Sequence, residues 1–64
     1  MKYIIEIDTD NAAFGESAQD ISNEITRILI EQVIDKQLQY DHFVEPLKLK
    51  DINGNTIGFA GLKD

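Results

Sequence analysis

The sequence contains no cysteine and no tryptophan, and it has a single proline, Pro46. Without cysteine, neither a disulfide framework nor a thiolate metal site can stabilise the fold, and a reducing compartment is favoured. No apolar run approaches the ~18 residues that a membrane-spanning helix needs. The opening "MKYIIEIDTD" lacks the long apolar region of a signal peptide. We therefore expect a cytoplasmic protein that does not bind membranes.

Basic residues are also scarce, since 6 Lys and Arg stand against 12 Asp and Glu, and the net charge is −6. Phosphate repels such a surface, so we expect no direct binding to nucleic acid. Three interpretations of the acidity remain: it keeps the protein soluble, it docks on a basic protein surface, or it imitates nucleic acid there.

The length of 64 residues allows one domain, 1–64, with one small core. A core of this size supplies about 3–5 kcal/mol of net stability. Self-association would add buried apolar area that such a core lacks.

Residues 2–8 alternate between apolar and polar side chains, which predicts a strand with one buried face. Phe14, in the connection that follows, is expected to tuck under the sheet. Residues 17–39 form the longest periodic segment and predict a helix that begins with Ser17 as its cap. Its sheet-facing stripe is expected to comprise Ala18, Ile21, Ile25, Ile28, Leu29 and Val33.

The pair Asn53-Gly54 separates two further alternating runs and predicts a tight hairpin, because both residues tolerate positive φ. The fold class is therefore α+β: a small β-α-β-β domain with a three-stranded sheet, at least partly antiparallel, and one long helix packed on one face. The position of the first strand in the sheet stays open. The residues expected to be buried against the helix are Tyr3, Ile5, Ile7, Leu47, Leu49, Ile57 and Phe59.

The predicted helix carries a second apolar stripe, Ile30, Ile34 and Leu38, well over 90° from the centre of the first. A 23-residue helix of about 34 Å is longer than strands of about 20 Å, so its C-terminal part is expected to overhang the sheet. Arg27 and Glu31 are expected to flank this stripe, as charged residues flank a packed helix seam.

The second stripe predicts a partner-binding face, made of Ile30, Ile34 and Leu38 with Arg27 and Glu31 beside them. Its simplest partner is the same face of a second copy, which gives a homodimer. Two alternatives stay open: residues 40–44 fold back over the stripe, or the stripe is simply exposed.

Candidate catalytic residues are few, and we expect no catalytic site and no cofactor. His42 is the sole histidine, with no nucleophile adjacent to it in the chain. A small enzyme or ligand carrier would require His42, Asp8 and Asp10 to converge on one pocket.

Two acidic stretches superficially match calcium loops. The stretch that starts at Asp8 has alanines where a third oxygen ligand and the glycine belong. The stretch "DINGNTIGFAGL" offers oxygens from Asp51, Asn53 and Asn55, but Leu62 stands where the bidentate acid belongs. The hairpin explains the second stretch fully, and we expect no metal site.

Three segments together carry a resemblance: "IDTDNAAF" at 7–14, "EITRIL" at 24–29 and "LKDINGNTIG" at 49–58. They resemble a group of small, mostly uncharacterised proteins of phages, prophages and mobile elements, in which a "DNAAF" connection, a helix with "RIL" and a terminal "L-D-NGN-VG" follow in this order. The resemblance implies a phage or mobile-element context, hence the host cell cytoplasm. The group's helix turns charged directly after "RIL", whereas this chain has Ile30.

These observations predict a non-enzymatic, acidic protein-binding module that acts by binding a host protein. Its specific form is an inhibitor of a defence nuclease or complex, which presents acidic side chains where nucleic acid would bind. Grouping of the acidic residues on one surface would support such mimicry, namely Glu6, Asp8, Asp10, Glu16 and Asp20. The alternative is a structural or assembly protein whose role is its own oligomer.

Overall fold

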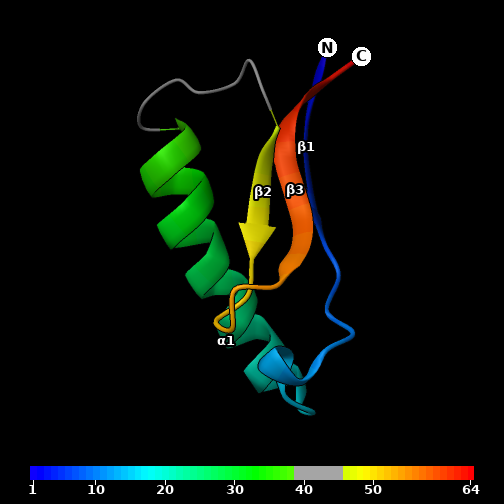
Figure 1. Ribbon diagram of the computed structural model, residues 1–64, viewed down its shortest axis with the longest axis vertical. Helices are drawn as coiled ribbons and strands as arrows, with labels where there is room; N and C mark the ends of the chain where they lie inside the picture. Colours follow the sequence, from blue (N-terminus) through cyan, green and yellow to red (C-terminus); the bar gives the residue numbers. More distant parts are fainter. Residues whose placement is uncertain (39–45) are drawn as a thin grey trace.

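The computed structural model of the chain describes residues 1–38 and 46–64. Along the chain these residues form β1 (Lys2–Ile7), the short 3-10 helix η1 (Ala12–Phe14), α1 (Ala18–Ile28), its continuation η2 (Leu29–Leu38), β2 (Leu47–Lys50) and β3 (Thr56–Lys63). One long helix therefore lies on a three-stranded sheet (Figure 1). The predicted α+β class and the β-α-β-β order are confirmed.

The sheet is antiparallel throughout, and its strand order is β1-β3-β2. The first strand thus joins β3, which makes β3 the central strand and leaves β1 and β2 as edges. Ala60 of β3 lies opposite Ile5 of β1 and opposite Leu47 of β2. Residues directly opposite each other share a face, so these three positions belong to the helix-facing side.

The hairpin between β2 and β3 has a longer loop than the two residues that Asn53-Gly54 predicts. The N–H of Gly54 donates to the carbonyl of Asp51 at 3.1 Å, and the N–H of Asp51 donates to the carbonyl of Asn55 at 2.9 Å. Three residues therefore form the loop, and Gly54, with φ of 84°, takes the left-handed position that ends it. Ile52 and Asn53 form the centre of the turn.

A register shift between Leu49 and Lys50 changes which residues of β3 reach the core. Such a bulge inserts one extra residue and interrupts the alternation of faces. Ile57 and Ala60 are both buried, whereas Phe59 lies opposite Glu6 and Lys48, outside the core cluster. The prediction that Ile57 and Phe59 share the buried face is therefore wrong.

The predicted helix boundaries, 17–39, agree with the structure within one residue at each end. Ser17 caps the first turn, since its hydroxyl accepts the N–H of Asp20 at 3.0 Å. From Leu29 the hydrogen-bonding pattern changes from α to π. Ile28 and Val33 are buried as predicted, but Ala18, in the first turn, is exposed.

The N-terminal half of the helix, not the C-terminal half, extends past the sheet (Figure 1). The connection after β1 carries the chain beyond the end of the sheet, and the helix then returns alongside the strands. As a result α1 contacts η1, while η2 contacts β2. The predicted C-terminal overhang is therefore wrong, and the second stripe lies on the part of the helix that packs on the sheet.

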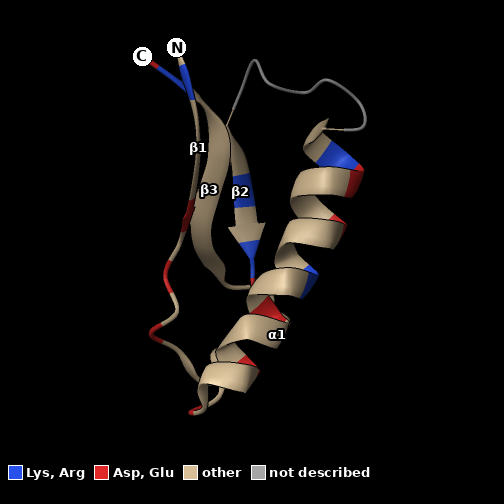
Figure 2. Ribbon diagram, turned by 180° about the vertical axis from the view of Figure 1, so that it is seen from behind, with Lys and Arg blue, Asp and Glu red and all other residues tan. Residues whose placement is uncertain are grey.

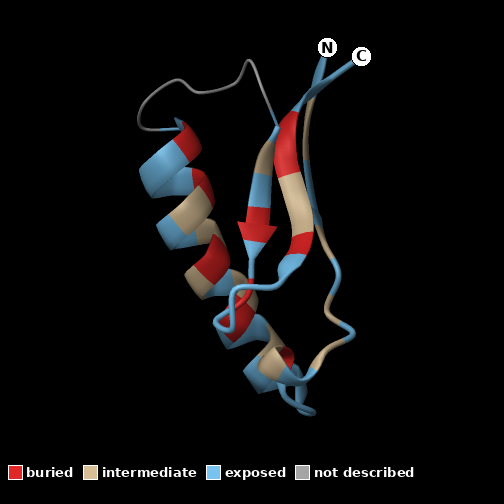
Figure 3. Cartoon of the chain, viewed as in Figure 1, coloured by how far each residue is buried: buried red, intermediate tan, exposed pale blue. Residues whose placement is uncertain are grey.

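The core lies between the long helix and the sheet, as the buried segments in Figure 3 show. Its buried members come from every element except β1: Phe14, Ile28, Val33, Leu49, Ile57 and Ala60. Phe14 is 0 % exposed, so it closes the end of the core as predicted. Ile5 is 41 % exposed, which contradicts its predicted burial; it lies on β1, an edge strand of the sheet.

Candidate functional site

The second stripe is exposed in the structure. Ile30 and Ile34 are each 49 % exposed and Leu38 is 40 % exposed, although Val33, between them, is only 2 % exposed. Neighbouring aliphatic side chains of this kind on one flank of a helix mark a binding surface more often than a single exposed residue does. Residues 40–44, whose folding over the stripe was the alternative, lie outside the described residues.

Hydrogen bonds from the helix to the sheet fix the direction in which the stripe points. The side-chain amide of Gln32 donates to the carbonyl of Lys50 at 2.7 Å, and its oxygen accepts the N–H of Lys50 at 2.8 Å. Gln32 therefore lies on the flank next to the outer edge of β2. Ile30 is two positions before Gln32, and Ile34 is two positions after it. Two positions correspond to about 200° around a helix, so both residues point to the opposite flank, away from β2.

Gln37 marks the underside of the helix, between those two flanks. It is 1 % exposed, and its amide donates to the carbonyl of Ala60 at 2.8 Å. Its oxygen accepts the hydroxyl of Tyr3, and burial raises the pKa of that tyrosine. Because Ala60 is in β3 and Tyr3 in β1, the underside covers the sheet from the centre toward β1.

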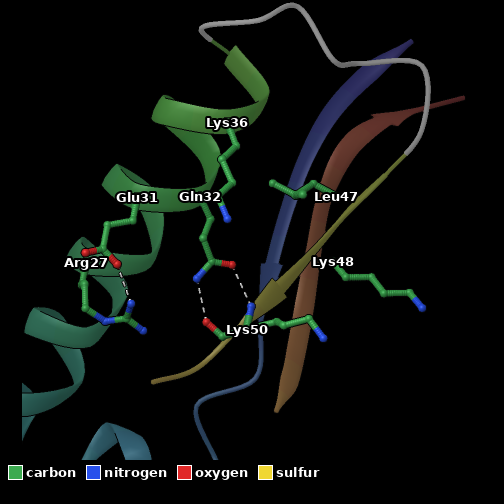
Figure 4. Close-up of a pocket in the computed structure, with 7 residues that line it drawn as sticks. All are labelled: Arg27, Glu31, Gln32, Lys36, Leu47, Lys48 and Lys50. Atoms are coloured by element: carbon green, nitrogen blue, oxygen red, sulfur yellow. Dashed lines mark hydrogen bonds and ion pairs between the residues drawn. The ribbon is translucent and has the colours of Figure 1, made fainter. Parts of the chain in front are cut away.

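A groove of about 570 Å³ separates the helix from β2. It is lined by Arg27, Glu31, Gln32, Lys36, Leu47, Lys48 and Lys50 (Figure 4). Figure 4 shows that the side chain of Lys36 points into the groove, while that of Lys48 extends away from the helix. The lining of the groove includes four of the chain's 6 basic residues and one acidic residue, Glu31.

Arg27 and Glu31, the predicted flanking residues, line this groove on the side of Gln32. The guanidinium of Arg27 donates to Glu24 at 2.7 and 3.1 Å and to Glu31 at 2.6 Å. These bonds, foremost the one to Glu24, raise the pKa of Arg27, and the hydrogen bond from Arg27 lowers the pKa of Glu24. Glu24 also accepts the N–H of Ile52 at 3.3 Å, which ties the helix to the hairpin turn.

Asp51, the first of the residues considered for calcium in the hairpin stretch, has structural partners. The N–H groups of Asn53 and Asn55 each donate to one oxygen of Asp51 at 2.9 Å. The side-chain amides of Asn11 and Asn55 donate to its other oxygen at 3.1 and 3.3 Å. Within residues 1–38 and 46–64, no group of three or more acidic, histidine or cysteine side chains could hold a metal ion.

The residues of the enzyme hypothesis are only partly described. The N–H of Asp10 donates to the carboxylate of Asp8 at 2.9 Å, which is a local turn bond in an exposed connection. His42 lies outside the described residues, so their convergence is not tested.

Exposed acidic residues occur along β1, in the connection after it and on the helix. Figure 2 shows acidic segments along β1, along the connection that follows it and on the helix, where basic segments also occur; further basic segments are on β2 and near the two ends of the chain. Glu6, Asp8, Asp10, Glu16 and Asp20 are all exposed; the first four follow one another along β1 and the connection after it, and Asp20 lies in the first turn of α1.

Comparisons with family models, with curated proteins and with solved structures give no match. Among the described residues, no helix has the length and apolarity that crossing a membrane requires.

Proposed function

We propose that this protein is a non-enzymatic protein-binding module, whose docking face is the stripe of Ile30, Ile34 and Leu38. The observation that carries the proposal is the exposure of these side chains beside a buried core, 49, 49 and 40 %. Burial of such side chains in an interface supplies about 25 cal/mol per Å² of apolar area. A small domain with a limited core gains most from covering them.

The first partner of this face is a second copy of the chain. A two-fold dimer brings the same patch of each copy together, so one stripe is enough to build the interface. The stripe itself is aliphatic, and the charged residues Arg27 and Glu31 line the groove beside β2 and bond to each other at 2.6 Å.

The second partner is a host protein, in the phage or mobile-element context that the sequence resemblance implies. The acidic side along β1 and the connection after it supports docking on a surface that otherwise binds nucleic acid. The proposed target is therefore a nuclease or a nucleic-acid-binding complex of host defence, which the module inhibits by occupying that surface.

We expect Ile34→Glu and Ile30→Glu each to convert the dimer into a folded monomer. Two carboxylates would have to be buried per interface, and an unpaired buried charge costs several kcal/mol. Sedimentation velocity at high micromolar concentration measures the change. The matched control is Ile52→Glu, the same substitution at a hairpin residue that is 70 % exposed, and it should leave the dimer unchanged. A wild-type monomer at these concentrations would contradict self-association.

We expect affinity capture from host lysate to retain a nucleic-acid-binding protein on the wild type and on Ile52→Glu. Replacing Asp8 and Asp10 together by Asn should weaken that capture and make it less dependent on salt, because complementary charge steers such association. Purified target and its nucleic acid should then compete for one surface. Capture that does not change with the acidic residues, or no competition, would contradict nucleic-acid mimicry.

A further inference from the structure

The strand β1 presents a backbone edge that the fold leaves open. Asp8 donates its N–H to the carbonyl of Ile57 at 2.7 Å, so the even-numbered residues of β1 direct their backbone groups toward β3. By the same alternation, Ile5 and Ile7 direct theirs outward. Within residues 1–38 and 46–64, no strand pairs with that outer edge. An open edge of this kind is a template for another strand.

The other edge of the sheet, β2, is protected. Both outward backbone groups of Lys50 are bonded by Gln32, at 2.7 and 2.8 Å. An antiparallel pairing of two β2 strands centred on Lys48, Leu49 or Lys50 would place lysine opposite lysine, and like charges directly opposite are destabilising. Lysines on an edge strand are a common device against such pairing. Apart from Lys2 at its end, β1 carries no lysine along its outer edge.

The charges along β1 are arranged with opposite signs at its two ends. Lys2 lies at one end, directly opposite Lys63 of β3. Asp8 and Asp10 follow the other end, and both are exposed. Antiparallel pairing of two β1 strands brings the basic end of each copy against the acidic end of the other.

We propose that two copies of the chain join through β1, antiparallel and centred on Ile5, into one continuous six-stranded sheet. In this register Ile5 lies opposite Ile5 of the second copy, Ile4 opposite Glu6, and Lys2 opposite Asp8. A register centred on Glu6 would place two glutamates against each other. A register centred on Ile4 would pair Lys2 with Glu6 rather than with Asp8, and it would place Met1 opposite Ile7.

The exposed apolar residues of β1 and of the helix lie on the side of the molecule that would face the second copy. Ile5 is opposite Ala60, which is buried under the helix, so the 41 % exposed side chain of Ile5 is on the helix-facing side of the sheet. Ile30 and Ile34 lie on the helix flank turned away from β2. In the joined sheet the stripes of the two copies therefore face each other across the two-fold axis, with Ile5 of each copy on the floor between them. This inference rests on the proposed self-association and specifies its geometry.

Amide hydrogen exchange tests the pairing directly. Exchange at Ile5 should slow by about 100-fold or more from dissociating to associating concentrations, since its N–H gains a partner only in the dimer. The matched control is Lys48, whose N–H points outward on β2, and its exchange should be the same at both concentrations. A dimer in which the Ile5 amide exchanges as fast as in the monomer overturns the proposal.

Charge reversal tests the register. Lys2→Glu and Asp8→Lys should each raise the dimer dissociation constant about tenfold or more, and the double variant should restore it to within about threefold. Lys36→Glu, the same change in the groove beside β2, should have no effect. Rescue of Lys2→Glu by Glu6→Lys instead would overturn the register centred on Ile5. If Ile34→Glu abolishes the dimer but no change in β1 affects it, β1 pairing is overturned and the proposed function stands. If the wild type forms no dimer at all, the self-association itself is overturned.

Discussion

Replacing Phe14 by alanine is expected to unfold most of the protein at 25 °C. The side chain is 0 % exposed and closes the end of the core where the long helix runs past the sheet. Truncating a buried phenylalanine costs about 3–5 kcal/mol, through lost transfer free energy and the cavity that remains. A single core of this size supplies about the same amount in total. Circular dichroism and urea titration at fixed protein concentration measure the loss.

Phe59→Ala is the matched control for this prediction. Phe59 has the same side chain but lies outside the core cluster, with the Lys63 ammonium 5.9 Å from its ring centroid. Its removal leaves no closed cavity, so we expect a loss of about 1 kcal/mol. Equal destabilisation by the two substitutions would show that Phe14 does not close the core as described. Because association adds to apparent stability, both variants must be compared at one concentration.

Local patterns predict the elements of this fold well. Three patterns depend only on neighbours within a few positions: the alternation over residues 2–8, the helical period of residues 17–39 and the turn residues at 53–54. The first strand, the long helix and the hairpin that they predict are all present. Phe14 was placed correctly because a large aromatic residue in a polar connection needs cover. The exposed stripe was also visible from periodicity alone, since Ile30 and Ile34 cannot face the sheet together with Val33.

The failures arise where distant residues decide the outcome. Alternation places Ile57 and Phe59 on one face, but a bulge opposite Leu49 and Lys50 breaks it, and nothing in the local sequence marks that bulge. Gln37 is buried because Tyr3 and Ala60, from two different strands, both bond its side chain. β1 has an open edge because the strand order is β1-β3-β2. The residue pattern of a single strand does not determine that order.

Asp51 is a further residue whose role depends on distant contacts. In the sequence Asp51 is a polar residue next to the hairpin turn, yet in the structure it is only 5 % exposed. Its carboxylate accepts the N–H groups of Asn53 and Asn55, each at 2.9 Å, and the side-chain amide of Asn11 at 3.1 Å. It therefore fastens the connection after β1 to the turn between β2 and β3.

We expect Asp51→Ala to lower the melting temperature by about 10 °C or more at neutral pH. The substitution removes the acceptor of several hydrogen bonds and leaves their donors without it inside a tight turn. Thermal denaturation followed by circular dichroism measures the shift. The control is Asp35→Ala, the same change at an exposed helix position, which should move the melting temperature by no more than a few degrees.

The same residue makes stability depend on pH in a defined direction. Burial alone would raise the pKa of Asp51, but the hydrogen bonds from Asn55, Asn53 and Asn11 outweigh it and lower the pKa below its ordinary value. An unfolded aspartate titrates near pH ~3.9, so its contribution is complete above that pH and is lost as the pH falls through the lower folded pKa. The pKa of Glu24 is also lowered, so Glu24 too makes stability fall at acidic pH, and it does so in both the wild type and Asp51→Ala. The stability of Asp51→Ala should therefore fall less steeply than that of the wild type as the pH falls below about 4; parallel curves would show that this carboxylate is not held in its charged form by the turn.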